Sequence, residues 1–173
     1  MTRPDIAYHM SILCSFMHDP TSTAYHAAID LLLYVSASSL TLHFPGLSKA
    51  LSGIDSSLHD NIRSSGGLVA YSDATWRRPN ALGFNMFGFV VYFMSAPVTF
   101  TSKQLKVVAL PSAKAEYAAA SYACREVVFV RNVLGFPLMH PTVVCVDNRA
   151  AIEIAHNIGV TSGNKHVRCY TLF

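Results

Sequence analysis

The sequence predicts an α/β fold preceded by a helical segment. Three strand-like runs rich in β-branched and aromatic residues lie between positions 68 and 101. A long run with helical spacing follows from Pro111, and then come a fourth strand-like run and a second helical run. The resulting order, β-β-β-α-β-α, is typical of a sheet covered by helices.

The first part of the chain is expected to form a short helical segment and a linker. Apolar residues recur at helical spacing from Pro20 to Val35, with Thr21 to Thr23 as candidates for the N-cap. Between Pro45 and Gly67, Gly and Ser residues lack sustained periodicity, and Ser64-Ser65-Gly66-Gly67 is the clearest stop. We therefore predict a domain boundary that separates residues 1–67 from residues 68–173.

The strands of the second part are expected at three places before the long helix. Leu68 to Ser72 is a short run that ends at Asp73, Phe87 to Met94 is a second, and Pro97 to Thr101 alternates as a third. Only Ser95-Ala96 separates the second run from the third. So short a connection predicts an antiparallel hairpin.

The two helices of this part have recognisable ends. Pro111-Ser112 begins a pattern of apolar residues every three or four positions, which Gly135 and Pro137 stop. Thr142 to Val146 is predicted as a buried strand that exits at Asp147-Asn148, and Ala150 to His156 as a second helix with Asn148 as its N-cap.

Three acidic residues occupy unusual places in this pattern. Glu116 lies on the apolar stripe of the long helix, where a charge is costly unless it is paired, protonated or bound to a metal. Asp73 and Asp147 each follow a strand at its carboxyl end, where sites of α/β sheets gather. Taken singly, Asp73 could open a turn, Asp147 could cap a helix and Glu116 could turn to solvent. Taken together, they suit divalent cations that prefer oxygen ligands.

The composition limits the classes of protein that the chain can represent. Of its 173 residues, 51% are hydrophobic and 13% are charged, so we expect some apolar surface to be covered by a partner. No run is long enough to cross a membrane, and the four cysteines form no C-x-x-C pair, which favours reduced thiols in an intracellular protein. The net charge of +3 is only a weak indication of polyanion binding.

Four motifs in fixed order carry a resemblance to a known family. They are Tyr71-Ser72-Asp73-Ala74-Thr75-Trp76, Ser112-Ala113-Lys114-Ala115-Glu116-Tyr117, Val146-Asp147-Asn148-Arg149-Ala150-Ala151-Ile152 and Asn164-Lys165-His166-Val167. Together they resemble the ribonuclease H region of copia-type retrotransposon polyproteins. The first segment, with Thr2-Arg3-Pro4-Asp5-Ile6-Ala7, resembles the end of the reverse transcriptase, although the chain has no Tyr-x-Asp-Asp polymerase motif.

The resemblance implies a ribonuclease H-like mixed five-stranded sheet and cleavage of the RNA strand of an RNA·DNA hybrid with two Mg²⁺ ions, for which Mn²⁺ could substitute. The implied partners are the hybrid and the reverse transcriptase domain of the same polyprotein, with no membrane. The implied location is intracellular, in cytoplasmic virus-like particles or in the nucleus. The implied catalytic residues are Asp73, Glu116, Asp147 and His166, of which the three acids are the metal ligands. The implied nucleic-acid contacts within the motifs are Asn148 and Lys165. Arg77 and Arg78 stand where the family has a polar loop with Gly and Asp, and their side chains could contact backbone phosphates or form a solvated loop pair.

The chain departs from the family pattern after the last motif. The family places a fourth metal-binding Asp just after the Lys-His-aliphatic triplet, but here Arg168 and Cys169 follow Val167. A weakened second metal position and slow cleavage are therefore expected. The alternative is a non-catalytic remnant of the same fold that binds nucleic acid or packs against the polymerase.

Overall fold

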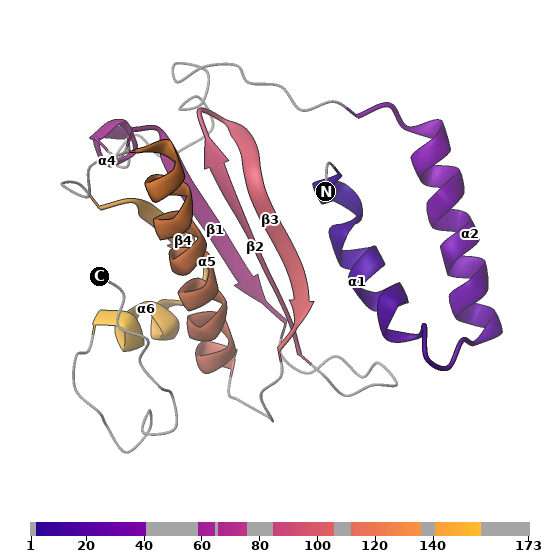
Figure 1. Ribbon diagram of the computed structural model, residues 1–173. Coiled ribbons are helices and arrows are strands. Elements are labelled where there is room, and N and C mark those ends of the chain that lie inside the picture. Colours follow the sequence, from indigo (N-terminus) through magenta and orange to yellow (C-terminus); the bar gives the residue numbers. More distant parts are fainter. Residues whose placement is uncertain are drawn as a thin grey trace.

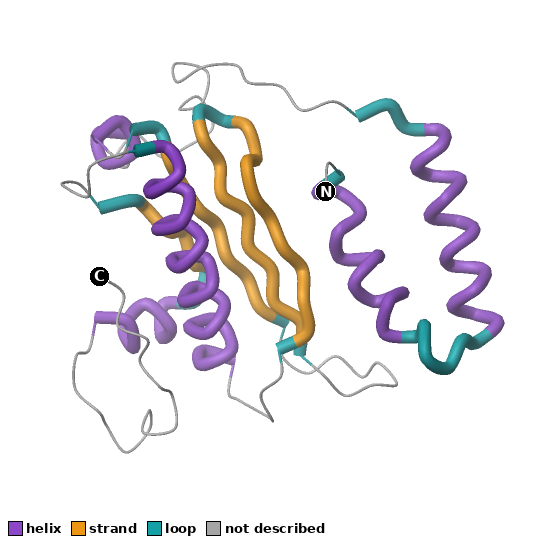
Figure 2. The backbone as a smooth tube through the Cα atoms, in the orientation of Figure 1, coloured by secondary structure: helices purple, strands orange, loops and turns teal. Residues whose placement is uncertain are grey.

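A four-stranded mixed sheet is the centre of the fold in the computed structural model, which describes residues 3–40, 59–64, 66–75, 85–105, 112–135 and 141–156 (Figures 1 and 2). The strand order is β3-β2-β1-β4, in which β1 pairs antiparallel with β2 and parallel with β4, and β2 pairs antiparallel with β3. The strands are β1 (Leu68–Ala74), β2 (Met86–Phe93), β3 (Ala96–Gln104) and β4 (Val143–Val146).

The described residues contain four strands and not the five that the resemblance implies. All four strands coincide with the strand-like runs of the sequence. The fifth strand had no such run of its own, so the number five did not rest on any local pattern in this chain. The α/β class itself is confirmed.

The predicted hairpin between the second and third strands is confirmed, with its turn shifted by one residue. β2 ends at Phe93 and β3 begins at Ala96, so that Met94 and Ser95 form the connection. Both turn residues have positive φ angles, 50° and 69°. Positive φ at both positions matches the twist of paired strands, which explains why such a short connection works here.

One face of the sheet packs against the long helix α5 (Ser112–Leu134). Leu68, Ala70 and Val91 contact Val127 and Val130 near its end. A second cluster joins the sheet to the start of the helix through Ala74, Phe87, Leu105, Ala115 and Ala119. The alanines of this second cluster let the start of α5 lie close to the sheet, and this proximity brings Glu116 to the end of β1.

The short helix α4 (His59–Ser64) lies where the sequence predicted a linker. Its Ile62 is 1% exposed and packs against Val69, next to Tyr92, Val143 and Cys145. The sequence indicated no helix at these residues. A six-residue helix with one buried apolar side chain is too short to show helical periodicity.

The N-terminal residues form a pair of helices on the side of the sheet opposite α5 (Figure 1). After the short η1 (Pro4–Ile6) come α1 (Ala7–Ser15), which contacts β3, and α2 (Ser22–Ala37). The prediction of a helix capped near Thr21 is confirmed, because the Thr21 hydroxyl accepts a hydrogen bond from the Ala24 amide at 3.1 Å. Within the described part of the chain, no helix has the length and apolar character needed to cross a membrane.

Candidate metal centre

Three carboxylates meet at one edge of the sheet. Asp73 lies near the end of β1, and Asp147 directly follows β4, which runs parallel to β1 with Ser72 opposite Val146. Glu116 comes from the start of α5. One carboxylate oxygen of each residue lies within 4.8 Å of those of the other two. The predicted convergence of the three acids is therefore present in the structure.

Glu116 is the buried member of this carboxylate cluster. Its side chain is part of the α5–sheet interface and only 6% of the residue is exposed, whereas Asp73 and Asp147 are exposed. Its Oε2 atom is buried and has no hydrogen-bond partner among the described residues. A buried oxygen without a partner is costly, so the site favours either a proton or a cation at this position.

The electrostatics of the cluster follow from this burial. Burial is the main cause that raises the pKa of Glu116 to about 7, and the negative charges of Asp73 and Asp147 raise it further. A hydrogen bond with the backbone of Ala74 lowers the pKa and offsets part of this shift. Like charges in one crevice disfavour joint ionisation. A divalent cation would remove this repulsion and supply a partner for the orphaned oxygen, so the three carboxylates fit Mg²⁺, which prefers oxygen ligands.

The residue after Asp147 holds the adjoining helix. Asn148 accepts a hydrogen bond through Oδ1 from the Ala151 amide at 3.1 Å, which caps α6 (Arg149–His156). The predicted N-cap is confirmed. This bond anchors the backbone where β4 passes into α6, and it thereby positions Asp147. The role of Asn148 in binding nucleic acid stays a prediction.

The other predicted site residues lie outside the described residues. This applies to Arg77 and Arg78, which follow β1, and to Lys165, His166 and the altered sequence at Arg168, which follow α6.

A cleft that no sequence pattern indicated lies beside the carboxylate cluster. It has a volume of about 570 Å³ and lies between the N-terminal η1–α1 segment and the face of the sheet that α5 does not cover. Tyr8 of α1 lines one side, and Tyr71, Tyr92 and Phe100 line the sheet side, with Asp73 at the edge. No local pattern links Tyr8 to Tyr71, so sequence periodicity could not reveal this cleft.

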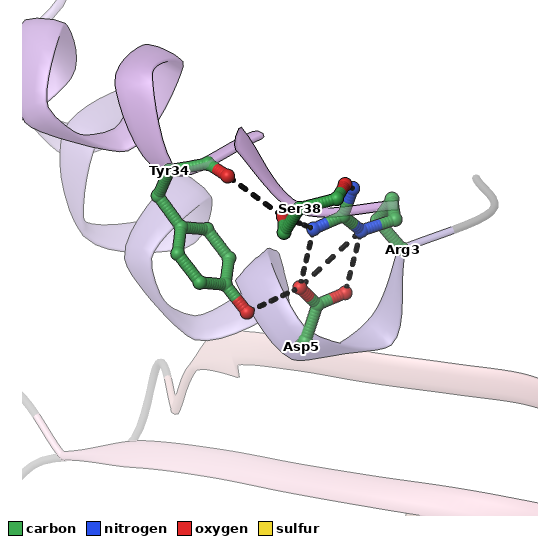
Figure 3. Close-up of polar contacts among 4 residues, drawn as sticks. All are labelled: Arg3, Asp5, Tyr34 and Ser38. Carbon is green, nitrogen blue, oxygen red and sulfur yellow. Dashed lines mark hydrogen bonds and ion pairs between the residues drawn. The ribbon is translucent and has the colours of Figure 1, made fainter. Parts of the chain in front are cut away.

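A polar cluster that the sequence analysis also missed holds the N-terminal segment in place (Figure 3). The Arg3 guanidinium donates hydrogen bonds to Asp5 at 2.8 and 2.9 Å and to the Ser38 hydroxyl at 2.8 Å. The Tyr34 hydroxyl donates to Asp5 Oδ2 at 3.1 Å. These bonds connect η1 with the end of α2, more than 25 residues away in sequence. We call Arg3, Asp5, Tyr34 and Ser38 the N-terminal clamp. From the sequence, only the close spacing of Arg3 and Asp5 could have indicated part of it.

Comparison with known proteins supports a transposon origin. The chain is 31% identical to the retrovirus-related Pol polyprotein from transposon RE2 of Arabidopsis thaliana, and 25% identical to that from transposon TNT 1-94 of Nicotiana tabacum, over 96% of its own length in each case. It is also 30% identical, over 75% of its length and 81% of the relative, to the secreted RxLR effector protein 161 of Plasmopara viticola. No protein-family profile and no solved structure matches the chain.

The chain is therefore a homologue of retrovirus-related Pol polyproteins from copia-type transposons. It spans about a tenth of the length of these relatives, 11% for RE2 and TNT 1-94. These relatives are polyproteins, and the chain matches one part of each.

Proposed function

We propose that this chain is a ribonuclease H, which hydrolyses the RNA strand of an RNA·DNA hybrid during reverse transcription. The observation that supports it best is the meeting of three carboxylate oxygens within 4.8 Å, one of them contributed by the buried Glu116. The four ordered motifs of the sequence and the transposon homologues agree with this function.

In this proposal Asp73, Glu116 and Asp147 hold two Mg²⁺ ions, or Mn²⁺ in their place. Bound divalent cations supply an activated water and stabilise the leaving oxygen in phosphodiester hydrolysis. With its pKa raised to about 7, Glu116 is partly protonated at neutral pH in the metal-free protein, so it would have to release this proton to solvent in order to serve as a ligand. Asp73 and Asp147 are exposed, so their carboxylates are accessible to a phosphate that approaches from solvent.

The remaining residues of the proposal bind and orient the hybrid. Its backbone phosphates would be bound by Arg77, Arg78, Asn148 and Lys165. His166 would orient a phosphate near the ions. Asn148 uses its side-chain oxygen for the helix cap, which leaves its amide NH₂ group as the donor for this role. The 2′-hydroxyls and the shape of the duplex would be recognised, with no preference for base sequence.

The same proposal places the chain beside the reverse transcriptase domain of its polyprotein. The enzyme would act where reverse transcription takes place, in cytoplasmic virus-like particles or in the nucleus. The similarity to Pol polyproteins over 96% of the chain supports this context.

The test is cleavage of an end-labelled RNA·DNA hybrid in Mg²⁺ and in Mn²⁺, with binding measured in Ca²⁺. We expect slow cleavage in Mg²⁺ and faster cleavage in Mn²⁺, which tolerates nitrogen ligands such as His166 better. Removing a group that stabilises charge in a transition state costs on the order of 100-fold or more in rate. We therefore expect at least that loss in Glu116→Gln and in Asp73→Asn.

Matched controls come from exposed acids outside the cluster. Glu153→Gln on α6 and Asp60→Asn on α4 change the same chemical groups without touching the three carboxylates, and should leave the rate unchanged. If the protein binds the hybrid but cleaves it in neither Mg²⁺ nor Mn²⁺, the non-catalytic alternative is supported instead. Equal rates in Glu116→Gln and Glu153→Gln would refute the proposed site.

A repaired chain tests the departure from the family pattern. Inserting Asp and then Val between Val167 and Arg168 should restore a fourth carboxylate near the ions. We expect a rate increase of about tenfold for each ~1.4 kcal/mol of transition-state stabilisation recovered. If the repaired protein binds the hybrid but cleaves no faster, the metal role assigned to this part of the chain should be abandoned.

A further inference from the structure

The cleft beside the carboxylate cluster has aromatic walls. Tyr71 and Tyr92, on neighbouring strands of the sheet, meet with their rings perpendicular and their centroids 5.9 Å apart. Phe100 of β3 lines the same wall, and Tyr8 lines the opposite side. Tyr71 remains 37% exposed. The exposed ring of Tyr71 is therefore accessible to a flat aromatic ligand, which can stack on an aromatic face.

One residue that lines the cleft belongs to the proposed metal centre. Asp73 lines the cleft and is also a member of the carboxylate cluster, so the two sites are continuous. No lysine or arginine lines the cleft within the described residues. Among the described residues, a phosphate would therefore find positive charge only from a cation bound at the carboxylate cluster, whereas the aromatic wall suits an uncharged ring.

The N-terminal clamp keeps the wall opposite the sheet in place. Pro4 and Asp5 line the cleft together with Tyr8, and Asp5 is bound by both Arg3 and Tyr34 (Figure 3). Because Arg3 lies beside Asp5, the carboxylate charge on this side is balanced. The cleft is therefore bounded on both sides, with a volume of about 570 Å³.

We infer that this cleft binds the base of an unpaired ribonucleotide whose phosphate lies at the carboxylate cluster. A nucleotide combines the two features of the site, a planar aromatic ring and an anionic group that binds divalent cations. Stacking on aromatic side chains is sequence-tolerant, because every base has a π-face. This inference rests on the proposed function and narrows its substrate to hybrids with an unpaired ribonucleotide next to the bound phosphate.

The experiment compares two hybrids in Ca²⁺ by fluorescence anisotropy. One is blunt, and the other has the same duplex with a short unpaired ribonucleotide tail. We expect the tailed hybrid to bind at least about fivefold more tightly, the lower end of what one base–aromatic stack provides. Tyr71→Ala should abolish the difference, whereas Tyr71→Phe, which retains the ring, should preserve it.

Two further variants control for the case in which Tyr71→Ala fails to fold. Tyr8→Ala removes a ring from the opposite wall without changing the sheet, and should also reduce the preference for the tail. Tyr25→Ala removes an exposed ring from α2, outside the cleft, and should have no effect. A 4-thiouridine in the tail should form photocrosslinks to β1 or α1 in the unaltered protein.

The outcomes separate this inference from the proposed function. Equal affinity of the unaltered protein for blunt and tailed hybrids would overturn the inference, and cleavage of the blunt hybrid would then leave the nuclease proposal intact. A tail preference that survives both Tyr71→Ala and Tyr8→Ala would overturn it as well. If the tail preference is lost in both Tyr71→Ala and Tyr8→Ala, and the unaltered protein cleaves no hybrid, the cleft binds the unpaired base but the proposed nuclease activity is refuted.

Discussion

Asp5 in the N-terminal clamp and Glu116 in the carboxylate cluster are both acids in polar surroundings, yet their pKa values move in opposite directions. Hydrogen bonding to Arg3 lowers the pKa of Asp5 to about 2, whereas burial raises the pKa of Glu116 to about 7. Asp5 has a guanidinium partner within the fold. Among the described residues, the partners of Glu116 are backbone and other acids.

The difference separates a structural carboxylate from one suited to a ligand. The charge of Asp5 is balanced inside the folded chain, so the clamp needs nothing from outside. The carboxylate cluster is unbalanced, and a proton or a cation must complete it. Burial beside other acids, rather than the presence of a carboxylate alone, is what makes Glu116 a candidate ligand.

The largest expected effect is the pH dependence of stability in the metal-free protein. The folded-state pKa of Glu116 is raised to about 7, so its protonated form stabilises the fold below its ordinary pKa of 4.5, and this contribution is lost as pH rises through about 7. At about 1.4 kcal/mol per pH unit, the loss amounts to up to about 3 kcal/mol.

Glu116→Gln should remove this loss and be more stable than the unaltered protein at pH 8 in EDTA. Urea denaturation at several pH values measures the effect, with Glu153→Gln as the control. Parallel stability curves for the unaltered protein and Glu116→Gln would contradict this prediction, because they would show that the burial of Glu116 has no electrostatic cost.

A second effect is stabilisation by divalent cations. Mg²⁺ or Mn²⁺ should raise the melting temperature, since a ligand that binds only the folded state at a hundred times its Kd adds about 2.7 kcal/mol. Asp147→Asn should lose most of this gain, and Asp5→Asn should retain it. An equal gain in both variants, measured by thermal denaturation, would assign the ion to another part of the chain.

A third, smaller effect concerns the helix caps of the two regions. Thr21 caps α2 and Asn148 caps α6, each through a side-chain oxygen that accepts a backbone amide. Thr21→Ala and Asn148→Ala should each cost about 1 kcal/mol of stability. Asn148→Ser should retain the cap.

The serine variant separates the two roles of Asn148. If Asn148 also contacts nucleic acid, Asn148→Ser should keep the free energy of unfolding and weaken hybrid binding in Ca²⁺. Unchanged binding would leave Asn148 as a capping residue, which positions Asp147 only through the backbone.

The smallest effect is expected at the N-terminal clamp itself. Because the folded-state pKa of Asp5 lies below its ordinary value of 3.8, its stabilising contribution is present above that pH and is lost as pH falls to about 2. The ion pair is near the surface, where such pairs contribute little. Asp5→Asn should therefore speed amide exchange in α1 and the end of α2 at neutral pH, with no change at pH 2. Unchanged exchange at neutral pH would show that the clamp does not hold α1.

Local patterns predicted those parts of the fold that depend on near neighbours in sequence. The four strands follow alternation or apolar runs, α5 begins and ends at the predicted residues Ser112 and Leu134, and Thr21 and Asn148 are caps. The same patterns failed at α4, because a helix of six residues has too little length for periodicity to appear.

The sequence alone was enough to predict the α/β class, the order of the elements from residue 68 onward and which three acids converge, since these depend on side-chain spacing over a few residues. The tertiary structure alone shows that β4 pairs parallel with β1, which brings Asp147 to Asp73, and that α5 packs closely enough to bury Glu116 beside them. The N-terminal clamp and the aromatic cleft were decided in the same way. The physical reason is that such contacts join residues distant in sequence, and their formation depends on the packing of the whole sheet and its helices.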